Sequence, residues 1–215
     1  MKKSILFFCV ASFLGFTGTA GAAAFQNGSF ELPAPGAAGI AFIGLVAPND
    51  SITGWTVESG SIKWVGSGWQ AEDGNSSIDM NGLGAGTLSQ TFDTVANTSY
   101  EVAFYMAGNP GGTDPLKSFE VSAPGFDQVF TFDTTGKSTT DMGWTNLSFT
   151  FSATSDAAKL TFTSLEEGLF GAALDNVRVG LANTGGNPVP EPATMLLLGA
   201  GLTGLAFCGR KKFVN

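Results

Sequence analysis

The 215-residue chain contains no histidine and only two cysteines. The lack of histidine excludes Ser-His and Cys-His nucleophile pairs, His-ligated zinc sites and an imidazole pH switch. Cys9 and Cys208 lie near opposite ends, so the sequence offers neither a disulfide framework nor a four-cysteine metal site. Basic residues are also scarce. The chain has 10 Lys and Arg and 18 Asp and Glu, which gives a formal net charge of −8. This balance argues against a nucleic-acid partner, which needs a basic footprint.

Residues 1–24 have the three-part layout of a secretory signal peptide. Lys2 and Lys3 give a positive start, residues 5–16 form a short apolar run, and small residues follow up to Ala24. The run is too short and wrongly flanked for a permanent membrane span. Cleavage after Ala22 or Ala24 satisfies the rule for small residues around the cleavage site, and we predict it after Ala24.

The C-terminal residues 189–215 form a second targeting segment. An apolar stretch of 15 residues, 193–207, is shorter than the roughly 20 residues that span a bilayer comfortably. A basic cluster that follows an apolar stretch should stay in the cytoplasm and leave the domain outside. The segment's other marks are the triplet Pro190, Glu191 and Pro192 and the cluster Arg210, Lys211 and Lys212.

This order of features resembles the PEP-CTERM sorting signal of Gram-negative bacteria. The resemblance implies an exosortase-type processing enzyme, a transient inner-membrane anchor and export to the cell surface or extracellular matrix. An ordinary C-terminal anchor is the alternative, and it predicts the same compartment.

Between these ends we predict one domain over residues 25–182, followed by a linker over 183–188. Residues 25–188 contain 5 bases and 17 of the 18 acids, so their formal charge is 5 − 17 = −12. They contain no cysteine, so the domain must be held by its core, or by its core and a metal. About 160 residues are enough to bury such a core.

Alternating hydrophobicity indicates strands throughout this domain. Val102, Phe104 and Met106 share one parity, and Phe149 and Phe151 alternate with polar residues. Ten or eleven such runs, separated by Gly, Pro, Asn and Asp clusters, predict an all-β antiparallel sandwich or jelly roll. The other expected strands are 25–32, 55–58, 61–65, 76–81, 86–93, 117–122, 128–132, 158–163 and 172–179. The Ala-, Pro- and Gly-rich stretch 32–48 is expected to be a loop.

Three segments, taken in chain order, resemble the galactose-binding-like jelly rolls, which include xylan- and glucan-binding modules. They are Asn27-Gly28-Ser29-Phe30-Glu31, Gly54-Trp55 and Leu174-Asp175-Asn176-Val177-Arg178-Val179. The segments 69–71, 77–82 and 88–92 resemble the bacterial choice-of-anchor C family, which is related to a plant cell-wall domain of unknown function. The resemblance implies an extracellular, non-enzymatic, glycan-associated domain.

Asp175 is the single residue for which the sequence makes the most specific prediction. It shares strand parity with Val177 and Val179, so it should point toward the core unless a bulge intervenes. A buried carboxylate is costly unless it is paired, hydrogen-bonded or coordinated. The resemblance implies a structural calcium ion between the opening segment and the closing strand. Its ligands would be Glu31, Asp175 and backbone carbonyls near Asn27 or Gly28, a suitable donor chemistry. Alternatively, Asp175 caps a turn or pairs with Arg178.

Aromatic and amide side chains are the candidate sugar contacts, because pyranose faces stack on aromatic rings and polar side chains hold hydroxyls. Trp144 and Tyr105 lie on the polar parity of their strands, and Asp79 and Asn81 alternate with the apolar Ile78 and Met80. Core or edge cover is the alternative for these aromatics. Three further tryptophans either line a ligand groove or seal loop ends, and these are Trp55, Trp64 and Trp69.

A polysaccharide-binding protein without turnover is the function that these features favour. An adhesive matrix protein without a sugar site is the first alternative. A glycoside hydrolase is the second, because two carboxylates suffice for that reaction. The candidate carboxylate pairs for such a reaction are the adjacent acids Glu166-Glu167 and Glu72-Asp73.

Overall fold

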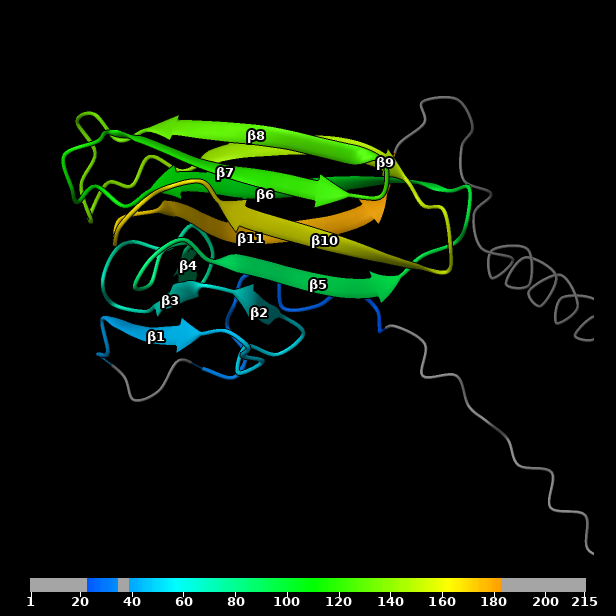
Figure 1. The fold of residues 1–215 in the computed structure, drawn as a ribbon, viewed down its shortest axis with the longest axis horizontal. Coiled ribbons are helices and arrows are strands. Elements are labelled where there is room, and N and C mark those ends of the chain that lie inside the picture. The colour runs from blue at the N-terminus through cyan, green and yellow to red at the C-terminus, as the bar shows by residue number, and fades with distance from the viewer. Residues whose placement is uncertain (1–22, 35–38, 183–215) are drawn as a thin grey trace, which may run out of the picture. The chain divides into compact units, whose positions relative to one another are not determined.

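The computed structural model describes residues 23–34 and 39–182, and every regular element in them is a β-strand (Figure 1). The strands are β1 (Phe42–Val46), β2 (Thr56–Ser59), β3 (Ser61–Val65), β4 (Ser77–Asp79), β5 (Thr87–Asp93), β6 (Ser99–Gly108), β7 (Leu116–Ala123), β8 (Phe126–Asp133), β9 (Thr145–Ser152), β10 (Ala157–Ser164) and β11 (Ala172–Leu181). Within the described ranges no helix is long and apolar enough to cross a membrane. The predicted linker and sorting segment, 183–215, and most of the predicted signal peptide lie outside them.

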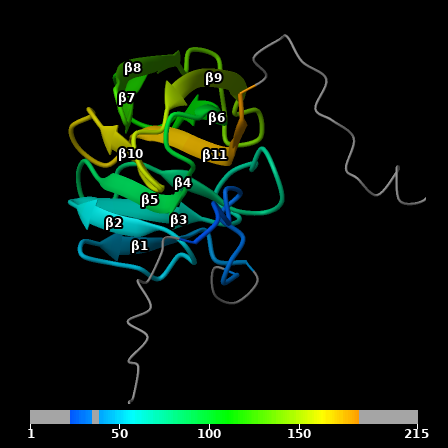
Figure 2. The ribbon, with the colours of Figure 1, turned by 90° about the vertical axis from the view of Figure 1, so that its right-hand side faces the viewer.

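Two antiparallel sheets pack face to face, which confirms the predicted sandwich. One sheet has the order β1-β3-β4-β11-β6-β9 and the other the order β2-β5-β10-β7-β8. Figure 2 views the sandwich from one end, with the two layers side by side. All strand pairs within both sheets are antiparallel, as the short alternating runs predict.

Aromatic rings fill the space between the sheets. Phe104 of β6 contacts Phe119 of β7 and Phe162 of β10, with ring centroids 5.8 and 5.5 Å apart. All three rings are fully buried, and burying one such side chain contributes roughly 1.5–3 kcal/mol. Because the domain has no cysteine, this packing takes the place of disulfides in joining the sheets.

The prediction of a first strand over residues 25–32 is wrong. Asn27 and Phe30 adopt positive φ angles of 53° and 58°, which break an extended run. The segment is held instead by side chains. Gln90, which is 3% exposed, accepts a hydrogen bond from Gln26 N (2.8 Å) and donates one to Gln26 O (2.9 Å). The segment therefore crosses the sandwich without joining either sheet as a regular strand.

Strand β1 lies within the stretch that was expected to be a loop. Its residues Phe42–Val46 pair with Ser61–Val65 of β3 at the edge of the six-stranded sheet. Ile43 and Leu45 face the core, whereas Phe42 and Val46 are more than half exposed. An edge strand this short, among Ala, Gly and Pro residues, gives too few alternating positions for its period to be recognised.

Gly28 marks the closest contact between the opening segment and β11. Val177 N donates to Gly28 O (2.9 Å), and a Cβ at Gly28 would lie 1.8 Å from Val177 O. We expect Gly28→Ala to lower the free energy of unfolding by about 1–3 kcal/mol, because the backbone must shift to admit the methyl group.

Gly180→Ala is the matched control, because no atom lies within 4 Å of its added Cβ. Its expected effect is within about 0.5 kcal/mol. Urea denaturation followed by circular dichroism compares the two variants. Equal stabilities would show that the opening segment does not pack against β11 in this way.

Candidate functional site

Three half-buried aromatic rings lie on the outer face of the six-stranded sheet. Tyr105 belongs to β6, Trp144 immediately precedes β9, and Trp69 lies in the connection between β3 and β4. Trp69 and Trp144 both pack against a fully buried cluster made of Ala107, Met142 and Ala173. We call Trp69, Tyr105 and Trp144 the aromatic face.

Hydrogen bonds fix the orientation of both indoles. Trp69 Nε1 donates to Ser77 Oγ (2.7 Å), and Trp144 Nε1 donates to Gln70 O (2.9 Å). Gln70 directly follows Trp69, so this second bond ties the two tryptophan segments together. Rings held in this way lose little conformational entropy when a ligand stacks on them.

Polar side chains continue the sheet surface beside these rings. Tyr105 is paired in register with Asn146 of β9 and with Asp175 of β11, and the next outward position, Ala103, is paired with Ser148 and Arg178. Asn146, Ser148 and Arg178 are exposed. The face therefore combines apolar ring surfaces with amide, hydroxyl and guanidinium groups, which is the composition of a sugar-binding surface.

The sandwich core, not the outer face, contains Trp55 and Trp64, so the prediction of Trp64 as a ligand contact is wrong. They are 1% and 3% exposed. Their Nε1 atoms donate to Asn27 O (2.9 Å) and Phe30 O (2.8 Å). Trp64 shares the inward parity of Ile62 on β3, which the sequence already indicated. The two indoles anchor the irregular opening segment.

Asp79 and Asn81 are fully buried, so the structure contradicts their prediction as ligand contacts. Asp79 does point away from Ile78, as expected, but the loop between β10 and β11 covers it. Its Oδ2 accepts hydrogen bonds from Lys63 Nζ (3.0 Å) and Asn109 Nδ2 (2.8 Å). Its Oδ1 accepts hydrogen bonds from the backbone N–H groups of Asn81 and Gly171, both at 3.0 Å. Alternation gives the parity of a side chain but not what covers it.

Burial raises the pKa of Asp79, and the charge of Lys63 and the hydrogen bonds from Asn109 and Asn81 act against that rise. Lys63 also donates to the backbone oxygens of Asn81 and Leu169. We call Asp79, Lys63, Asn81 and Asn109 the buried polar network.

Asn81 carries the network to the covering loop. Its Nδ2 donates to Glu166 O (2.9 Å) and Gly168 O (3.0 Å), and its Oδ1 accepts a hydrogen bond from Ser164 Oγ (2.5 Å). The network thus holds the backbone of residues 164–171 at several points.

Asp175 is buried beneath a loop on the outer face, and a bulge sets its direction. The register of β11 against β6 shifts between Asp175 and Arg178, and Asn176 has a φ of 48°. Asp175 Oδ2 accepts hydrogen bonds from Glu72 N (2.8 Å) and Asp73 N (3.1 Å). Burial raises its pKa to about 7, although these backbone N–H groups and that of Asn176 lower it. The bulge that the prediction allowed for is present, so Asp175 does not point toward the core; it caps a turn, as the alternative held.

Glu31 caps the other end of the same loop. Its Oε1 accepts hydrogen bonds from Asn75 N and Ser76 N, both at 2.7 Å. The described residues hold no group of three or more acidic, His or Cys side chains placed to share a metal ion. However, Ser76 Oγ is buried beside Glu31 and has no hydrogen-bond partner among them. Asn27 and Gly28 use their carbonyls for Trp55, Phe30 and Val177. Calcium at this junction stays a prediction.

Ala107 and Ala173, which were not predicted from the sequence, belong to the buried cluster under the two tryptophans. Both are fully buried, and they are paired with each other on β6 and β11. Ala107 shares the outward parity of Tyr105. A small residue at an outward position next to an aromatic one is the sequence signal that could have predicted this support for the tryptophan rings.

A protein-family model described as "Protein of unknown function (DUF642)" matches residues 23–180. A second model, the PEP-CTERM protein-sorting motif, matches residues 188–212. These matches confirm both resemblances seen in the sequence. Halomucin of Haloquadratum walsbyi is 33% identical over 158 residues, which are 72% of this chain. The chain covers only 2% of the length of that relative.

Several solved structures are similar in fold to this chain. One is titled "CBM4 structure and function"; it has 15% sequence identity and a TM-score of 0.41, and the match covers 73% of this chain and 99% of that one. Another is the CBM22-1 xylan-binding domain of Paenibacillus barcinonensis Xyn10C, with 17% identity and a TM-score of 0.43, covering 65% and 92%. TmCBM61 with β-1,4-galactotriose has 18% identity and a TM-score of 0.44, covering 64% and 97%.

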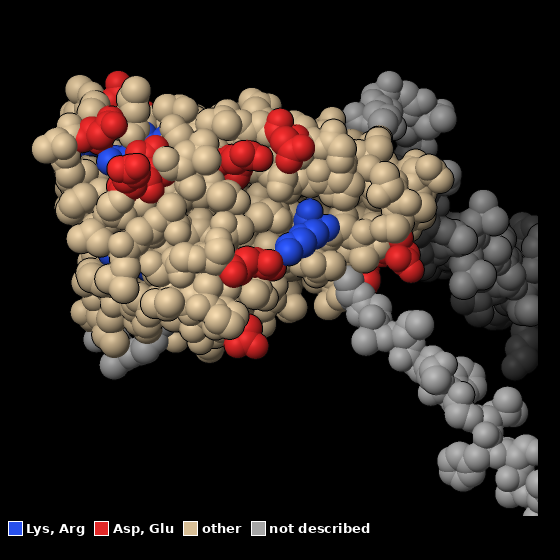
Figure 3. Space-filling model, viewed as in Figure 1, with Lys and Arg blue, Asp and Glu red and all other residues tan. Residues whose placement is uncertain are grey.

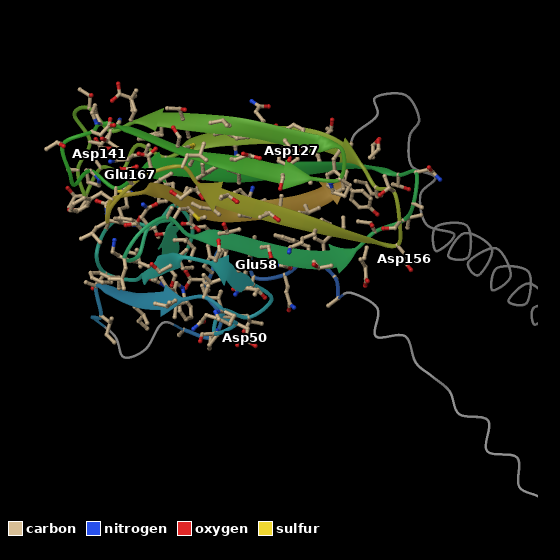
Figure 4. All side chains as sticks on the ribbon, in the orientation of Figure 1. Asp50, Glu58, Asp127, Asp141, Asp156 and Glu167 are labelled. Carbon is tan, nitrogen blue, oxygen red and sulfur yellow. The ribbon has the colours of Figure 1, made fainter. Side chains whose placement is uncertain are left out.

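The buried polar network yields a stability prediction. Asp79→Ala leaves the Lys63 ammonium without its carboxylate, and we expect it to lower the free energy of unfolding by about 3–5 kcal/mol. Glu58→Ala is the control, because Glu58 pairs at 2.8 Å with Lys159 on the exposed face shown in Figures 3 and 4. We expect this control to cost about 1 kcal/mol or less. Chemical denaturation measures both variants, and similar losses would contradict the central role of Asp79.

Proposed function

This chain belongs to the DUF642 family, and from that premise we propose that it is an exported, non-catalytic protein that binds neutral polysaccharide on its aromatic face. The observation that carries the proposal is the convergence of Trp69, Tyr105 and Trp144 on one sheet surface, with both indoles held by hydrogen bonds. Stacking on such rings binds the apolar faces of pyranoses, and neighbouring Asn146, Ser148 and Arg178 supply donors and acceptors for hydroxyls.

The charge of the chain supports a neutral polymer as the ligand. Residues 25–188 have a formal charge of 5 − 17 = −12, which repels a polyanion such as a uronic-acid polymer at moderate salt. Figure 3 shows acidic side chains scattered over the outer surface of the five-stranded sheet, with few basic ones among them. Glu58, which Figure 4 labels, pairs there with Lys159. A neutral glycan escapes this repulsion.

Export is supported by the two ends of the sequence. The PEP-CTERM motif over residues 188–212 favours an exosortase-type processing enzyme as a partner and a cell-surface or extracellular-matrix destination in a Gram-negative bacterium. The signal-peptide pattern of residues 1–24 favours the same route. A polysaccharide-binding face is useful in that compartment because surface glycans are present there.

The absence of turnover is supported by what the carboxylates beside the aromatic face do. Asp175 accepts backbone hydrogen bonds from Glu72, Asp73 and Asn176, and Glu72 accepts one at 2.5 Å from Asn176 Nδ2. A glycosidase needs one carboxyl group as acid and a second as nucleophile or base, both directed at the substrate. Carboxylates committed to capping a loop are poorly suited to either role.

Binding to insoluble cellulose, xylan and galactan tests the proposal. We expect the wild-type full chain to be depleted from solution by at least one of these polymers. Trp144→Ala and Tyr105→Ala should each weaken that binding at least tenfold, which corresponds to about 1.4 kcal/mol. Depletion isotherms at several polymer concentrations give the affinities.

Two variants control for indirect effects. Tyr105→Phe keeps the ring and should stay within about threefold of wild type, because a lost exposed hydroxyl contributes about 1 kcal/mol or less. Val129→Ala alters an exposed residue of β8 in the other sheet and should bind as wild type. Wild-type affinity in both Trp144→Ala and Tyr105→Ala would remove the aromatic face as the binding site.

A structural calcium ion between Glu31 and Asp175 is a separate proposal. It is supported by the two carboxylates at one junction and by the Ser76 hydroxyl, which has no hydrogen-bond partner among the described residues. An ion that binds only the folded chain stabilises it by about 2.7 kcal/mol at a hundredfold excess over Kd. We therefore expect EDTA to lower the melting temperature by several degrees, and Asp175→Ala to abolish that difference. Identical melts in calcium and in EDTA would leave both carboxylates as loop caps only.

A further inference from the structure

We propose that the buried polar network forms a covalent bond within the chain, an amide between the Lys63 side-chain nitrogen and the side-chain carbonyl carbon of Asn109. The domain contains no cysteine, and this bond links β3 to the segment after β6. Such a link restricts the unfolded chain in the way that a disulfide does. The bond involves neither the aromatic face nor a ligand, so it is independent of the proposed sugar binding.

Asp79 brings the two reacting groups together. Its Oδ2 accepts hydrogen bonds from both Lys63 Nζ (3.0 Å) and Asn109 Nδ2 (2.8 Å). Lys63 and Asp79 are paired in register on β3 and β4, whereas Asn109 directly follows β6. An amine, a carboxyl group and a primary amide, which come from three separate segments of the chain, therefore meet at a single oxygen atom.

Backbone groups hold the Asn109 amide and polarise it. Asn109 Oδ1 accepts a hydrogen bond from Gly111 N (2.9 Å). When a nucleophile adds to the amide carbon, negative charge develops on this oxygen, and the Gly111 N–H stabilises it as a donor of an oxyanion hole does. Asn109 N donates to Gly171 O (2.9 Å), which fixes the residue beside the start of β11. The electrophile is thus both activated and held in place.

The surroundings of Lys63 favour an uncharged amine, which is the form that acts as a nucleophile. Asp79 is fully buried, and the Lys63 side chain is 15% exposed. The Phe42 ring lies with its centroid 5.7 Å from Lys63 Nζ, and the backbone of Leu169 contacts the same nitrogen. Burial disfavours both charged groups, so it favours transfer of a proton from the ammonium to the carboxylate. The raised pKa of Asp79 agrees with this transfer.

The reaction exchanges one amide for another and releases ammonia. Asp79 takes a proton from the Lys63 ammonium, and the neutral amine adds to the amide carbon of Asn109 while the C=O π electrons move to Oδ1. Asp79 then gives its proton to Nδ2 and takes one from the attacking nitrogen. The bond from the carbon to Nδ2 breaks as the C=O bond forms again. Ammonia leaves and takes the last proton from Asp79, so the carboxylate is restored and no co-reactant is consumed.

Asn109 is a better acceptor for the amine than Asp79 itself. An amide between Lys63 and Asp79 requires the loss of water, and a second carboxylic acid is needed to protonate the leaving oxygen. In the described part of the chain, the groups that donate hydrogen bonds to Asp79 are Lys63, Asn109 and two backbone N–H groups, none of which is a carboxylic acid. For the Asn109 amide, Asp79 itself fills that role.

Mass spectrometry of the purified full chain, folded and then denatured, tests the proposal. We expect the wild-type chain to be lighter than the mass calculated from its sequence by the mass of one ammonia. Chymotryptic digestion should release the fragment that contains Lys63 covalently joined to the fragment that contains Asn109, since several aromatic cleavage sites lie between the two residues.

Three results would overturn the proposal. The first is a wild-type chain with its full calculated mass. The second is a lighter chain in which the Lys63 and Asn109 fragments are separate, because the ammonia then came from elsewhere. The third is the loss of water with a link between Lys63 and Asp79, which would exclude Asn109 as the acceptor.

Variants assign the roles of the three side chains. Lys63→Arg keeps a cation beside Asp79 but provides no neutral amine, and Asp79→Asn keeps the shape of the side chain but removes the carboxyl group. Both chains, shown to be folded by circular dichroism, should have their full calculated masses. Lys159→Arg is the control, because Lys159 pairs with Glu58 on the other sheet, and it should keep the link. A linked Asp79→Asn chain, or an unlinked Lys159→Arg chain, would refute the assignment. A failure of polysaccharide binding leaves the mass measurement unaffected, so the two proposals are tested separately.

Discussion

The burial of one carboxylate, that of Asp79, is the constraint on which the arrangement of this sandwich most depends. Asp79 is fully buried, and its two oxygens accept hydrogen bonds from two side chains and two backbone N–H groups. Because a buried charge without partners is very costly, all four donors must be in place at once. They come from β3, from the segments after β4 and β6, and from the residue just before β11. One side chain therefore fixes the meeting point of four separate parts of the chain.

The aromatic face lies next to this meeting point. Ala173, which is paired with Asp79 and with Ala107, lies beneath the tryptophans of the aromatic face. Asn81, two residues after Asp79, holds the loop between β10 and β11. The aromatic face is thus built on ordered backbone, which is how a protein without disulfides in its domain can hold rings in place for a ligand.

The sequence was most informative where alternation was long and regular. Strands β6 and β9 follow the predicted parity, and Tyr105 and Trp144 lie on the outer face for that reason. The family resemblance also identified the segments that meet at the junction of Glu31 and Asp175. Alternation could not show whether another segment covers a face of the sheet. Asp79 points away from Ile78 as expected, but a loop distant in sequence contacts and buries both Asp79 and Asn81.

The remaining errors have local backbone causes. Positive φ angles at Asn27 and Phe30 interrupt an apparently extended run, and the bulge at Asn176 turns Asp175 to the other side of the sheet. Such irregularities depend on contacts made only after folding, such as the indole hydrogen bonds to Asn27 O and Phe30 O.

The central claim is that half-buried tryptophans on one sheet face bind neutral sugars. Trp55 and Trp64 are buried, whereas Trp69 and Trp144 are accessible in part, so acrylamide quenching of tryptophan emission reports mainly on the aromatic face. Titration of the full chain with cellohexaose, xylohexaose and β-1,4-galactotetraose is the most direct measurement. The account predicts that at least one of them reduces quenching in a saturable way, and that the effect is lost when Trp69 and Trp144 are both replaced by Phe. Quenching that no oligosaccharide changes would contradict it.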